Sequence, residues 1–146
     1  MEVRTMSIRD YEEVYRLWTD TPGMGLNSLD DSREGIARYL ARNPRTCLVS
    51  IRAGRITGVI LSGHDGRRGF IYHLAVTVAE RGRGVGSALV REALCALAGE
   101  GITKAALVVF SGNGGGNLFW EKNGFAKRED LVYRNKSLRE STRLDT

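Results

Sequence analysis

The chain has 146 residues and a formal net charge of +5, and its 42% hydrophobic and 27% charged residues exclude a disordered chain. No run approaches the roughly 20 apolar residues of a membrane helix, and residues 1–9 lack the apolar core of a secretory signal. Cys47 and Cys95 have neither CxxC spacing nor clustered histidines, so we expect no disulfide framework, no metal site and a cytoplasmic location.

The N-terminal third predicts a short strand followed by two helices. Residues 2–6 alternate weakly between polar and apolar side chains, as a short strand does. Ser7 is placed to cap a helix over residues 8–19. Four apolar residues recur there at helical spacing, namely Tyr11, Val14, Tyr15 and Trp18. A second helix is predicted to begin near Asp31 or Ser32 and to end before the following Asn-Pro step.

Three strands and a long helix follow. Residues 46–51 and 56–61 flank an Ala-Gly turn, which predicts a hairpin. Residues 70–78 are the most strand-like segment, because they are long, β-branched and aromatic. A glycine-rich link then opens a helix from residue 85, whose apolar stripe ends at a Gly-Glu-Gly sequence.

The C-terminal part predicts shorter elements. Residues 104–110 form a strand of the buried type, residues 111–116 a loop and residues 118–122 a short helix. Residues 124–135 give a final strand region, and the polar tail from residue 138 frays. The order of elements is β-α-α-β-β-β-α-β-α-β, which predicts one mixed α+β domain.

The sharpest feature is the glycine-rich sequence between the third of these strands and the long helix. It reads Arg81-Gly82-Arg83-Gly84-Val85-Gly86-Ser87. Helix N-termini expose unpaired N–H groups and a partial positive charge, and glycines let the backbone approach a phosphate closely. With the positive charge of its two arginines, the segment predicts a pyrophosphate cradle. A Walker A loop and a dinucleotide-binding GxGxxG both fail to match its spacing and position.

At these residues the chain resembles the GNAT superfamily of acetyl-CoA-dependent N-acetyltransferases, within a bacterial and archaeal branch whose substrates are mostly unassigned. Leu74-Ala75-Val76 and the Arg81-to-Gly86 sequence match the family's Leu/Ile-Ala-Val and Arg/Gln-x-x-Gly-x-Gly/Ala signature. Asn113 and the later Phe119-Trp120-Glu121-Lys122-Asn123-Gly124-Phe125 match a second motif.

The resemblance implies the architecture of the whole chain. We expect one α+β domain over residues 1–138 and a polar C-terminal tail over residues 139–146. Its central mixed, mostly antiparallel sheet would be splayed between the fourth and fifth strands and flanked by about four helices.

The resemblance also implies acetyl-CoA as the co-substrate. The pantetheine arm would pair with the exposed edge of the fourth strand, because its two amides match free backbone N–H and C=O groups. The residues implied in binding are Leu74, Ala75, Val76, Arg81, Gly82, Arg83, Gly84, Val85, Gly86, Ser87, Asn113 and Trp120. For Asn113, capping of the next helix is an equal alternative. The glycines at 112–116 either take part in function or only form a flexible link.

Acetyl transfer to an amine needs a neutral amine, a polarised thioester carbonyl and a proton for the leaving thiolate. A backbone N–H near Val76 is placed to polarise the carbonyl. Many members of the family supply the proton from a tyrosine, where this chain has Trp120, whose indole cannot act as an acid near neutral pH. Tyr133 or solvent are the substitutes.

The general base is open at this stage. The fifth-strand position that carries a glutamate in many relatives is Val108 here, so Tyr72 and His73 are the candidates. Strict alternation divides the strand into two faces: Phe70, Tyr72, Leu74 and Val76 on one, and Ile71, His73 and Ala75 on the other. Tyr72 then has the better direction and His73 the better pKa, unless a β-bulge turns His73 towards the site. A water relay with no single base is a third option.

The function predicted from the sequence is N-acetyl transfer from acetyl-CoA to a primary amine of a small molecule or a protein, by direct attack on the thioester. The alternative is a non-catalytic acyl-CoA-binding regulatory module, which Val108 and Trp120 motivate. Nucleic-acid binding is disfavoured because the arginines and lysines are scattered. The net charge suits a phosphorylated ligand or solubility alone. We expect no membrane partner, and the resemblance is compatible with a homodimer.

Overall fold

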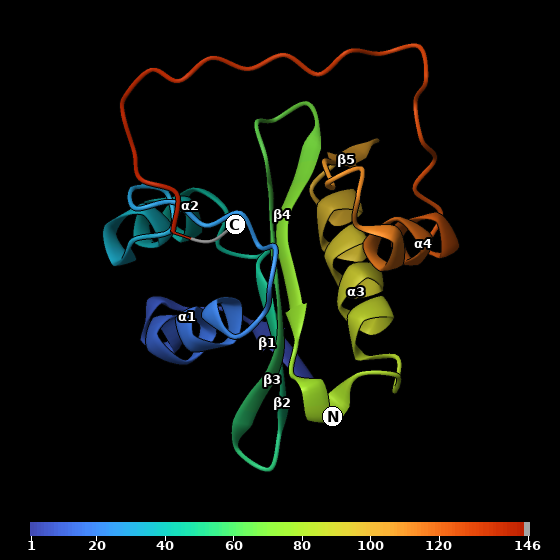
Figure 1. The fold of residues 1–146 in the computed structure, drawn as a ribbon. Helices are drawn as coiled ribbons and strands as arrows, with labels where there is room; N and C mark the ends of the chain where they lie inside the picture. Colours follow the sequence, from blue (N-terminus) through green and yellow to red (C-terminus); the bar gives the residue numbers. More distant parts are fainter. Residues whose placement is uncertain (145–146) are drawn as a thin grey trace.

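The computed structural model describes residues 1–144 and contains one five-stranded sheet in the order β1-β2-β3-β4-β5. Neighbouring strands are antiparallel except β4 and β5, which are parallel. Helices α1 and α2 cover one face of the sheet, and α3 and α4 cover the other (Figure 1). Within the described residues, none of the helices is both long and apolar enough to cross a membrane.

The elements follow the predicted order as far as the last helix. The strands are β1 Glu2–Thr5, β2 Leu48–Arg52, β3 Arg55–His64, β4 Gly69–Val76 and β5 Ala105–Leu107. The helices are α1 Tyr11–Thr19, α2 Arg33–Arg42, α3 Val85–Gly99 and α4 Gly114–Lys122, with short 3₁₀ helices η1 Ile8–Asp10 and η2 Val78–Glu80. The predicted mixed α+β class and the four helices are confirmed.

The two N-terminal helices begin where the sequence predicts. Ser7 occupies the N-cap of η1, which continues into α1, and its backbone N–H donates to the Asp10 carboxylate at 2.9 Å. Ser32 caps α2, since its hydroxyl accepts a hydrogen bond from the Gly35 N–H at 3.0 Å. Side-chain caps of this kind satisfy backbone donors that have no partner within the helix.

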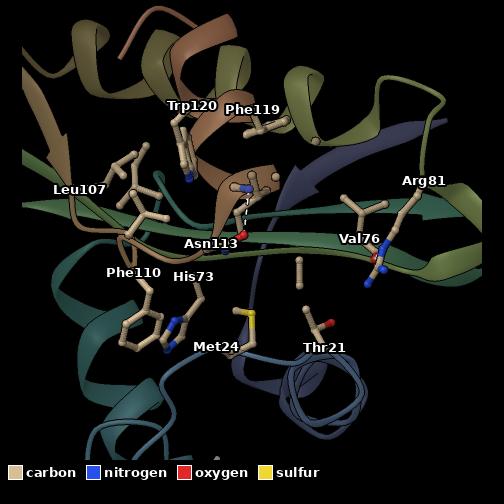
Figure 2. Close-up of a pocket in the computed structure, with 18 of the residues that line it drawn as sticks. Thr21, Met24, His73, Val76, Arg81, Leu107, Phe110, Asn113, Phe119 and Trp120 are labelled. Carbon is tan, nitrogen blue, oxygen red and sulfur yellow. Dashed lines mark hydrogen bonds between the residues drawn. The ribbon is translucent and has the colours of Figure 1, made fainter. Parts of the chain in front are cut away.

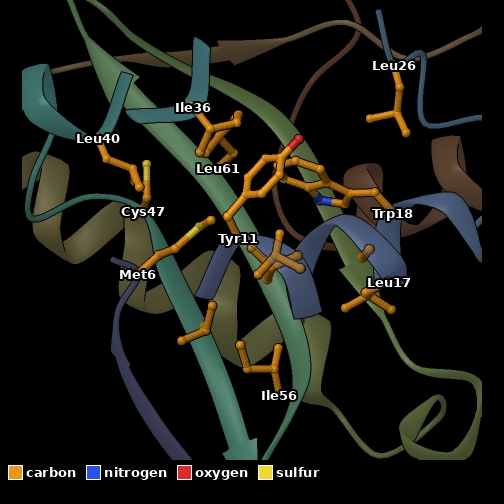
Figure 3. Packing of buried hydrophobic residues seen from close by; sticks show 14 residues of the cluster. Met6, Tyr11, Leu17, Trp18, Leu26, Ile36, Leu40, Cys47, Ile56 and Leu61 are labelled. Atoms are coloured by element: carbon orange, nitrogen blue, oxygen red, sulfur yellow. The ribbon is translucent and has the colours of Figure 1, made fainter. Parts of the chain in front are cut away.

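Two hydrophobic clusters lie on opposite faces of the sheet. The cluster under α1 and α2 includes Trp18, Leu26 and Val59, all of which are buried (Figure 3). The cluster under α3 includes Ile60 and Leu89. The amphipathic pattern of α1 and the apolar stripe of α3 therefore direct these helices to opposite sides of one sheet.

A β-bulge in β4 overturns the predicted division of its side chains. Leu61 of β3 pairs with His73, but the next residue, Ser62, pairs with Ile71, so Tyr72 is an extra residue in the ladder. Leu74 and Val76 pack towards α3, as expected for one face.

Beyond the bulge the alternation is reversed. Ile71 lies on the α3 face with Leu74, whereas Tyr72 contacts Tyr39 of α2 and His73 contacts Trp18 of α1. The prediction that Tyr72 and His73 face opposite sides is wrong, because the bulge puts both on the α1 and α2 face.

The C-terminal part differs most from the prediction. Strand β5 ends at Leu107, three residues before the predicted end. Helix α4 begins at Gly114, so three glycines predicted to lie in a loop form its first turn. The predicted final strand over residues 124–135 is wrong, because residues 125–141 form an extended arm without helix or strand.

The end of the chain returns to the folded body. The described residues of the C-terminal end make an isolated antiparallel bridge between Asn27 and Arg143. The Ser28 N–H donates to the Thr142 carbonyl at 2.8 Å, and the Leu144 N–H donates to the Leu26 carbonyl at 2.9 Å. The predicted frayed tail is therefore wrong for residues 142–144, because backbone pairing holds them.

Asp10 joins the start of α1 to β1. Its carboxylate accepts two hydrogen bonds from Arg4, each at 2.8 Å, and the Arg4 hydrogen bond lowers the pKa of Asp10. Because the folded-state pKa lies below the unfolded one, this stabilisation is present above about pH 4 and is lost as pH falls through the folded-state pKa.

Replacing Arg4 by Gln is therefore expected to lower the free energy of unfolding by about 1–3 kcal/mol near neutral pH. The loss should shrink in strong acid, as Asp10 takes up a proton and the charge-dependent contact disappears from the parent. Urea unfolding of the parent and the variant at both pH values measures the difference. Equal losses at both would contradict a charge-dependent contact.

Candidate active site

A cavity of about 1090 Å³ opens where β4 and β5 separate (Figure 2). The two strands pair only from Gly69 to Ile71 on the β4 side, and beyond that point they diverge. Residues 71–76 of β4 form one wall and residues 107–110 the other, while α4, the loop before α3 and residues 21–25 complete it. The predicted splay is present, and every predicted site residue except Arg83 lines the cavity.

The edge of β4 that faces the cavity carries backbone groups directed away from β3. The Thr77 N–H donates to the Thr57 carbonyl at 2.8 Å, and Ala75 pairs with Val59 two residues earlier. Hydrogen bonding in an antiparallel ladder alternates, so the backbone groups of Ala75 point to β3 and those of Leu74 and Val76 point into the splay. Leu74 and Val76 are thus the positions at which an extended ligand can pair with this strand.

The glycine-rich loop forms one end of the cavity. Gly82 and Gly84 have φ values of 76° and 80°, a left-handed backbone that glycine adopts without strain, and Gly84 is the N-cap residue of α3. A Cβ on Gly86 would lie 3.2 Å from the Phe119 ring, so a glycine permits this close approach of α3 and α4. The first turn of α3 consequently presents its N–H groups at the cavity.

The two arginines of this loop have protein partners. The Arg81 Nε donates to the Val76 carbonyl at 3.0 Å, which fixes the guanidinium beside the free edge of β4. Arg83 is not among the residues that line the cavity, and its Nη1 lies 3.9 Å from the Glu80 carboxylate, which also pairs with Arg52 at 3.3 Å. Arg81 is therefore the arginine placed to meet a bound anion, a distinction that the sequence pattern alone does not make.

Helix α4 supplies the far wall. The Asn113 Oδ1 accepts the Gly116 N–H at 2.9 Å, so Asn113 caps the helix, and its Nδ2 is left to donate into the cavity. Trp120 packs edge to face between Phe119 and Phe125, with ring centroids 5.1 Å apart in both pairs. The capping and ligand-binding alternatives for Asn113 are therefore compatible, because they use different atoms.

Tyr72 lies in the wall at the bulge and is 56% exposed. Its ring lies 4.7 Å from that of Phe70 and 5.7 Å from that of Tyr39. Partial burial raises the pKa of Tyr72, and the neighbouring Tyr133 and Asp30 raise it further. The hydroxyl thus stays protonated across the neutral range, which suits a hydrogen-bond donor and not a base.

His73 lies beside Tyr72 but makes two hydrogen bonds within the protein. Its Nε2 lies 2.8 Å from the Asp31 Oδ1, and its Nδ1 lies 3.0 Å from the Tyr72 carbonyl oxygen. A carbonyl oxygen only accepts, so Nδ1 carries a proton, and Nε2 is engaged with the carboxylate whichever partner holds the other proton. Neither ring nitrogen therefore offers a lone pair to an amine in the cavity.

Asp31 makes a contact with His73 that the sequence does not predict. It is buried, and besides His73 it accepts the Asn27 N–H at 2.8 Å through its other carboxylate oxygen. Its backbone carbonyl also accepts the Tyr11 hydroxyl at 2.7 Å. The sequence carries no signal for this role, because Asp31 stands next to a helix N-cap, where an aspartate is ordinary.

Several known proteins are similar to this chain in sequence and in fold. A family model described as the acetyltransferase (GNAT) family matches residues 11–125. A curated acetyltransferase of Sodalis glossinidius is 33% identical over 138 residues, which are 94% of this chain and 96% of that protein. One of Photorhabdus laumondii is 34% identical over 135 residues, or 91% and 93% of the two chains.

Solved structures agree with these matches. Ard1 from Thermoplasma volcanium is 26% identical, with a TM-score of 0.73 over 86% of this chain and 82% of its own. The PaiA N-acetyltransferase from Thermoplasma acidophilum, solved with coenzyme A, has the same fold, with 23% identity and a TM-score of 0.74 over 90% and 92% of the two chains. The chain therefore belongs to the acetyltransferase (GNAT) family and is an acetyl-CoA-dependent acetyltransferase.

Proposed function

We propose that the protein transfers the acetyl group of acetyl-CoA directly to a primary amine of a small molecule or a peptide. The observation that carries the proposal is the free edge of β4, which faces a cavity that ends at the glycine-rich start of α3. An extended amide-bearing arm fits the strand edge, and a pyrophosphate fits the helix N-terminus.

The residues of the cavity fit acetyl-CoA from end to end. The N–H groups of residues 82–87 and the Arg81 guanidinium would hold the diphosphate, and Val85 and Ser87 belong to the same turn. The Val76 backbone and the Leu74 carbonyl would pair with the pantetheine amides, with Ala75 between them. Asn113 Nδ2 and the Trp120 ring would bind that arm from α4.

When bound, acetyl-CoA supplies a thioester with an electrophilic carbonyl carbon. In the transfer a C–N bond forms, the C–S bond breaks, the amine loses a proton and the thiolate gains one. The Leu74 N–H, which points into the splay further from the glycine-rich loop than the Val76 N–H does, would donate to the carbonyl oxygen as negative charge develops on it. No carboxylate lies at Val108, so the amine would arrive neutral or lose its proton to water.

Tyr72 and His73, the two candidates for proton transfer, then have different roles. Tyr72 has an exposed hydroxyl in the cavity wall, which would orient the amine or its water. His73 is buried and bonded to Asp31, so it would hold the loop before α2 against β4. Tyr133, which also lines the cavity, is a further donor for the leaving thiolate.

Replacing Tyr72 by Phe is expected to lower kcat by about 2- to 12-fold, the equivalent of one lost hydrogen bond of 0.5–1.5 kcal/mol. The raised pKa of Tyr72 means that the variant should keep the shape of the parent's pH–rate profile through the neutral range, since Tyr72 does not titrate there. Steady-state rates of both proteins across pH, with one accepted amine, measure this.

His73→Ala in the same series decides the identity of the base. We expect the acidic limb of the variant's pH–rate profile to stay, because the deprotonation of the amine substrate sets that limb. Loss of the limb together with a fall of about 10²–10⁴-fold in rate would make His73 the general base.

The test of the proposed function is a panel of amines and peptides assayed for thiol release from acetyl-CoA. The panel should include aminoglycosides and an alanine-ended peptide, since solved structures of the same fold are named as aminoglycoside and ribosomal-protein-alanine acetyltransferases. At least one acceptor should raise thiol release above the rate without acceptor.

A non-catalytic acyl-CoA-binding module is the second candidate. The engaged nitrogens of His73 and the exposed apolar Val108 favour it, because neither of these two positions then supplies a free side-chain base. Tight binding of acetyl-CoA with no accelerated thiol release on the whole panel would support it. The homodimer, the cytoplasmic location, the absence of nucleic-acid binding and the division at residue 138 stay predictions.

A further inference from the structure

The end of the chain is joined to the loop that follows α1 by a short piece of antiparallel pairing, here called the clasp (residues 142–144 against residues 26–28). Besides the two backbone hydrogen bonds given above, the Thr142 N–H donates to the Ser28 Oγ at 2.9 Å. The arm that leads to the clasp starts at α4, on the other side of the sheet (Figure 1). The clasp thus joins two parts of the chain more than a hundred residues apart.

The loop that the clasp holds forms a wall of the cavity. Met24 and Gly25 line the cavity opposite α4, directly before the clasped residues. Gly23 and Gly25 have φ values of 77° and 76°, and a Cβ on either would meet nothing within 4 Å, whereas Met24 packs against the core and Leu26 is buried in it. Hydrophobic packing therefore anchors this loop at Leu26, and backbone contacts at residues 26–28 add to its support.

The backbone contacts come from two directions, namely from the body of the fold and from residues 142–144. From inside, Asp31 accepts the Asn27 N–H, and its other oxygen bonds to His73 of β4. From outside, the clasp pairs with Leu26 and Ser28 on either side of the same residue. Asn27 is consequently held between β4, which it reaches through Asp31, and residues 142–144.

The clasp also reaches the opposite wall of the cavity. The Arg143 guanidinium carbon lies 5.2 Å from the centroid of the Phe110 ring, and Phe110 lines the cavity beyond the end of β5. A guanidinium over an aromatic face is an attractive contact. The C-terminus therefore connects the loop after α1 with the segment after β5, across the opening between them.

Little else holds the arm in place. Residues 131–141 are exposed, and among the described residues no hydrogen bond joins them to the rest of the chain. The few contacts of the clasp therefore decide whether the C-terminus stays on the loop.

We propose that residues 142–144 are a positioning element for the acceptor: their clasp orders residues 24–28 into the wall against which the amine acceptor binds. The inference rests on the proposed function, since it assigns this wall to the acceptor and the opposite end of the cavity to acetyl-CoA. Releasing the clasp should weaken acceptor binding and leave acetyl-CoA binding unchanged, because the glycine-rich loop and β4 make no contact with it.

The experiment compares proline variants that each remove one N–H of the clasp with a proline elsewhere in the arm. Thr142→Pro and Leu144→Pro remove the donors to Ser28 and Leu26, and Arg139→Pro is the matched control in the unbonded arm. With the best acceptor of the panel, both clasp variants should raise KM for that acceptor by about 2- to 12-fold, as expected for one lost hydrogen bond. The control should match the parent, and calorimetry should give one Kd for acetyl-CoA in all four proteins. Equal acceptor KM values in the clasp and control variants would overturn the proposal.

A second readout does not depend on catalysis. Amide hydrogen exchange over residues 24–31 should be faster in both clasp variants than in Arg139→Pro, because the loop loses its outer support. Unchanged exchange would overturn the proposal even if the protein acetylates nothing on the panel. Faster exchange in both clasp variants, with no turnover of any acceptor, would instead support the ordering role of the clasp and refute the proposed function.

Discussion

Replacing Gly84 by Asp is expected to abolish the stabilisation of the protein by acetyl-CoA. A ligand at 100 times its Kd stabilises a protein by about 2.7 kcal/mol, which for a chain of this size raises Tm by roughly 5–10 °C. At Gly84 a carboxylate would stand at the N-terminus of α3, where the diphosphate is proposed to bind, and would repel it. Thermal unfolding with and without acetyl-CoA measures the change.

The fold should survive this substitution, which makes the result interpretable. A Cβ on Gly84 meets nothing within 4 Å, and an aspartate at a helix N-cap offsets part of the strain of its φ of 80°. Gly84→Asn is the nearly isosteric control without charge and should retain part of the shift. Gly66→Asp adds the same charge at another glycine with positive φ, at the far end of β4, and should retain all of it. A full Tm shift by acetyl-CoA in Gly84→Asp would show that the diphosphate does not bind at this loop.

Replacing Leu74 by Pro is expected to lower kcat by about 10²–10³-fold, the usual effect of removing one donor to a developing oxyanion. Proline lacks the N–H, and at Leu74 that N–H points into the splay and not to β3. The ladder from β3 to β4 therefore keeps its hydrogen bonds, and the preceding His73 belongs to the same strand, whose extended backbone a residue before proline prefers. Single-turnover rates with saturating acetyl-CoA measure the chemical step.

Leu74→Ala is the matched control, because it removes the side chain and keeps the N–H. It should retain most of the parent's kcat, and the two variants should unfold at similar temperatures. A Leu74→Pro protein that is folded, binds acetyl-CoA and turns over at the rate of Leu74→Ala would show that another group polarises the carbonyl.

The parts of the site that follow from local chemistry could be predicted from the sequence. Ser32 is a capping residue next to an amphipathic run, and the glycines of residues 82–86 lie between a strong strand and a strong helix. Each of these signals depends on a few adjacent residues, which the sequence displays directly. The cofactor end of the cavity is accordingly where prediction and structure agree best.

The end of the cavity that is proposed to bind the acceptor depends on contacts between distant segments, and there the structural prediction fails. The bulge at Tyr72 arises from the register of β3 against β4, which no local pattern in residues 70–78 reveals. The pairing of His73 with Asp31 links residues 42 positions apart. The triple glycine of α4 has poor helix propensity, and the cap from Asn113 to Gly116 together with the packing of Phe119 and Trp120 overrides it.

The central claim is that this cavity transfers an acetyl group and does not merely bind acetyl-CoA. The most direct measurement is mass spectrometry of a reaction between one amine from the panel and acetyl-CoA deuterated in its acetyl group. It quantifies the label on the acceptor, on the protein and in the remaining acetyl-CoA, together with the free CoA released. The account predicts one labelled amide per CoA released, no labelled protein, and loss of product in Gly84→Asp. Label that stays on CoA in the presence of every acceptor, although the protein binds acetyl-CoA, would contradict it.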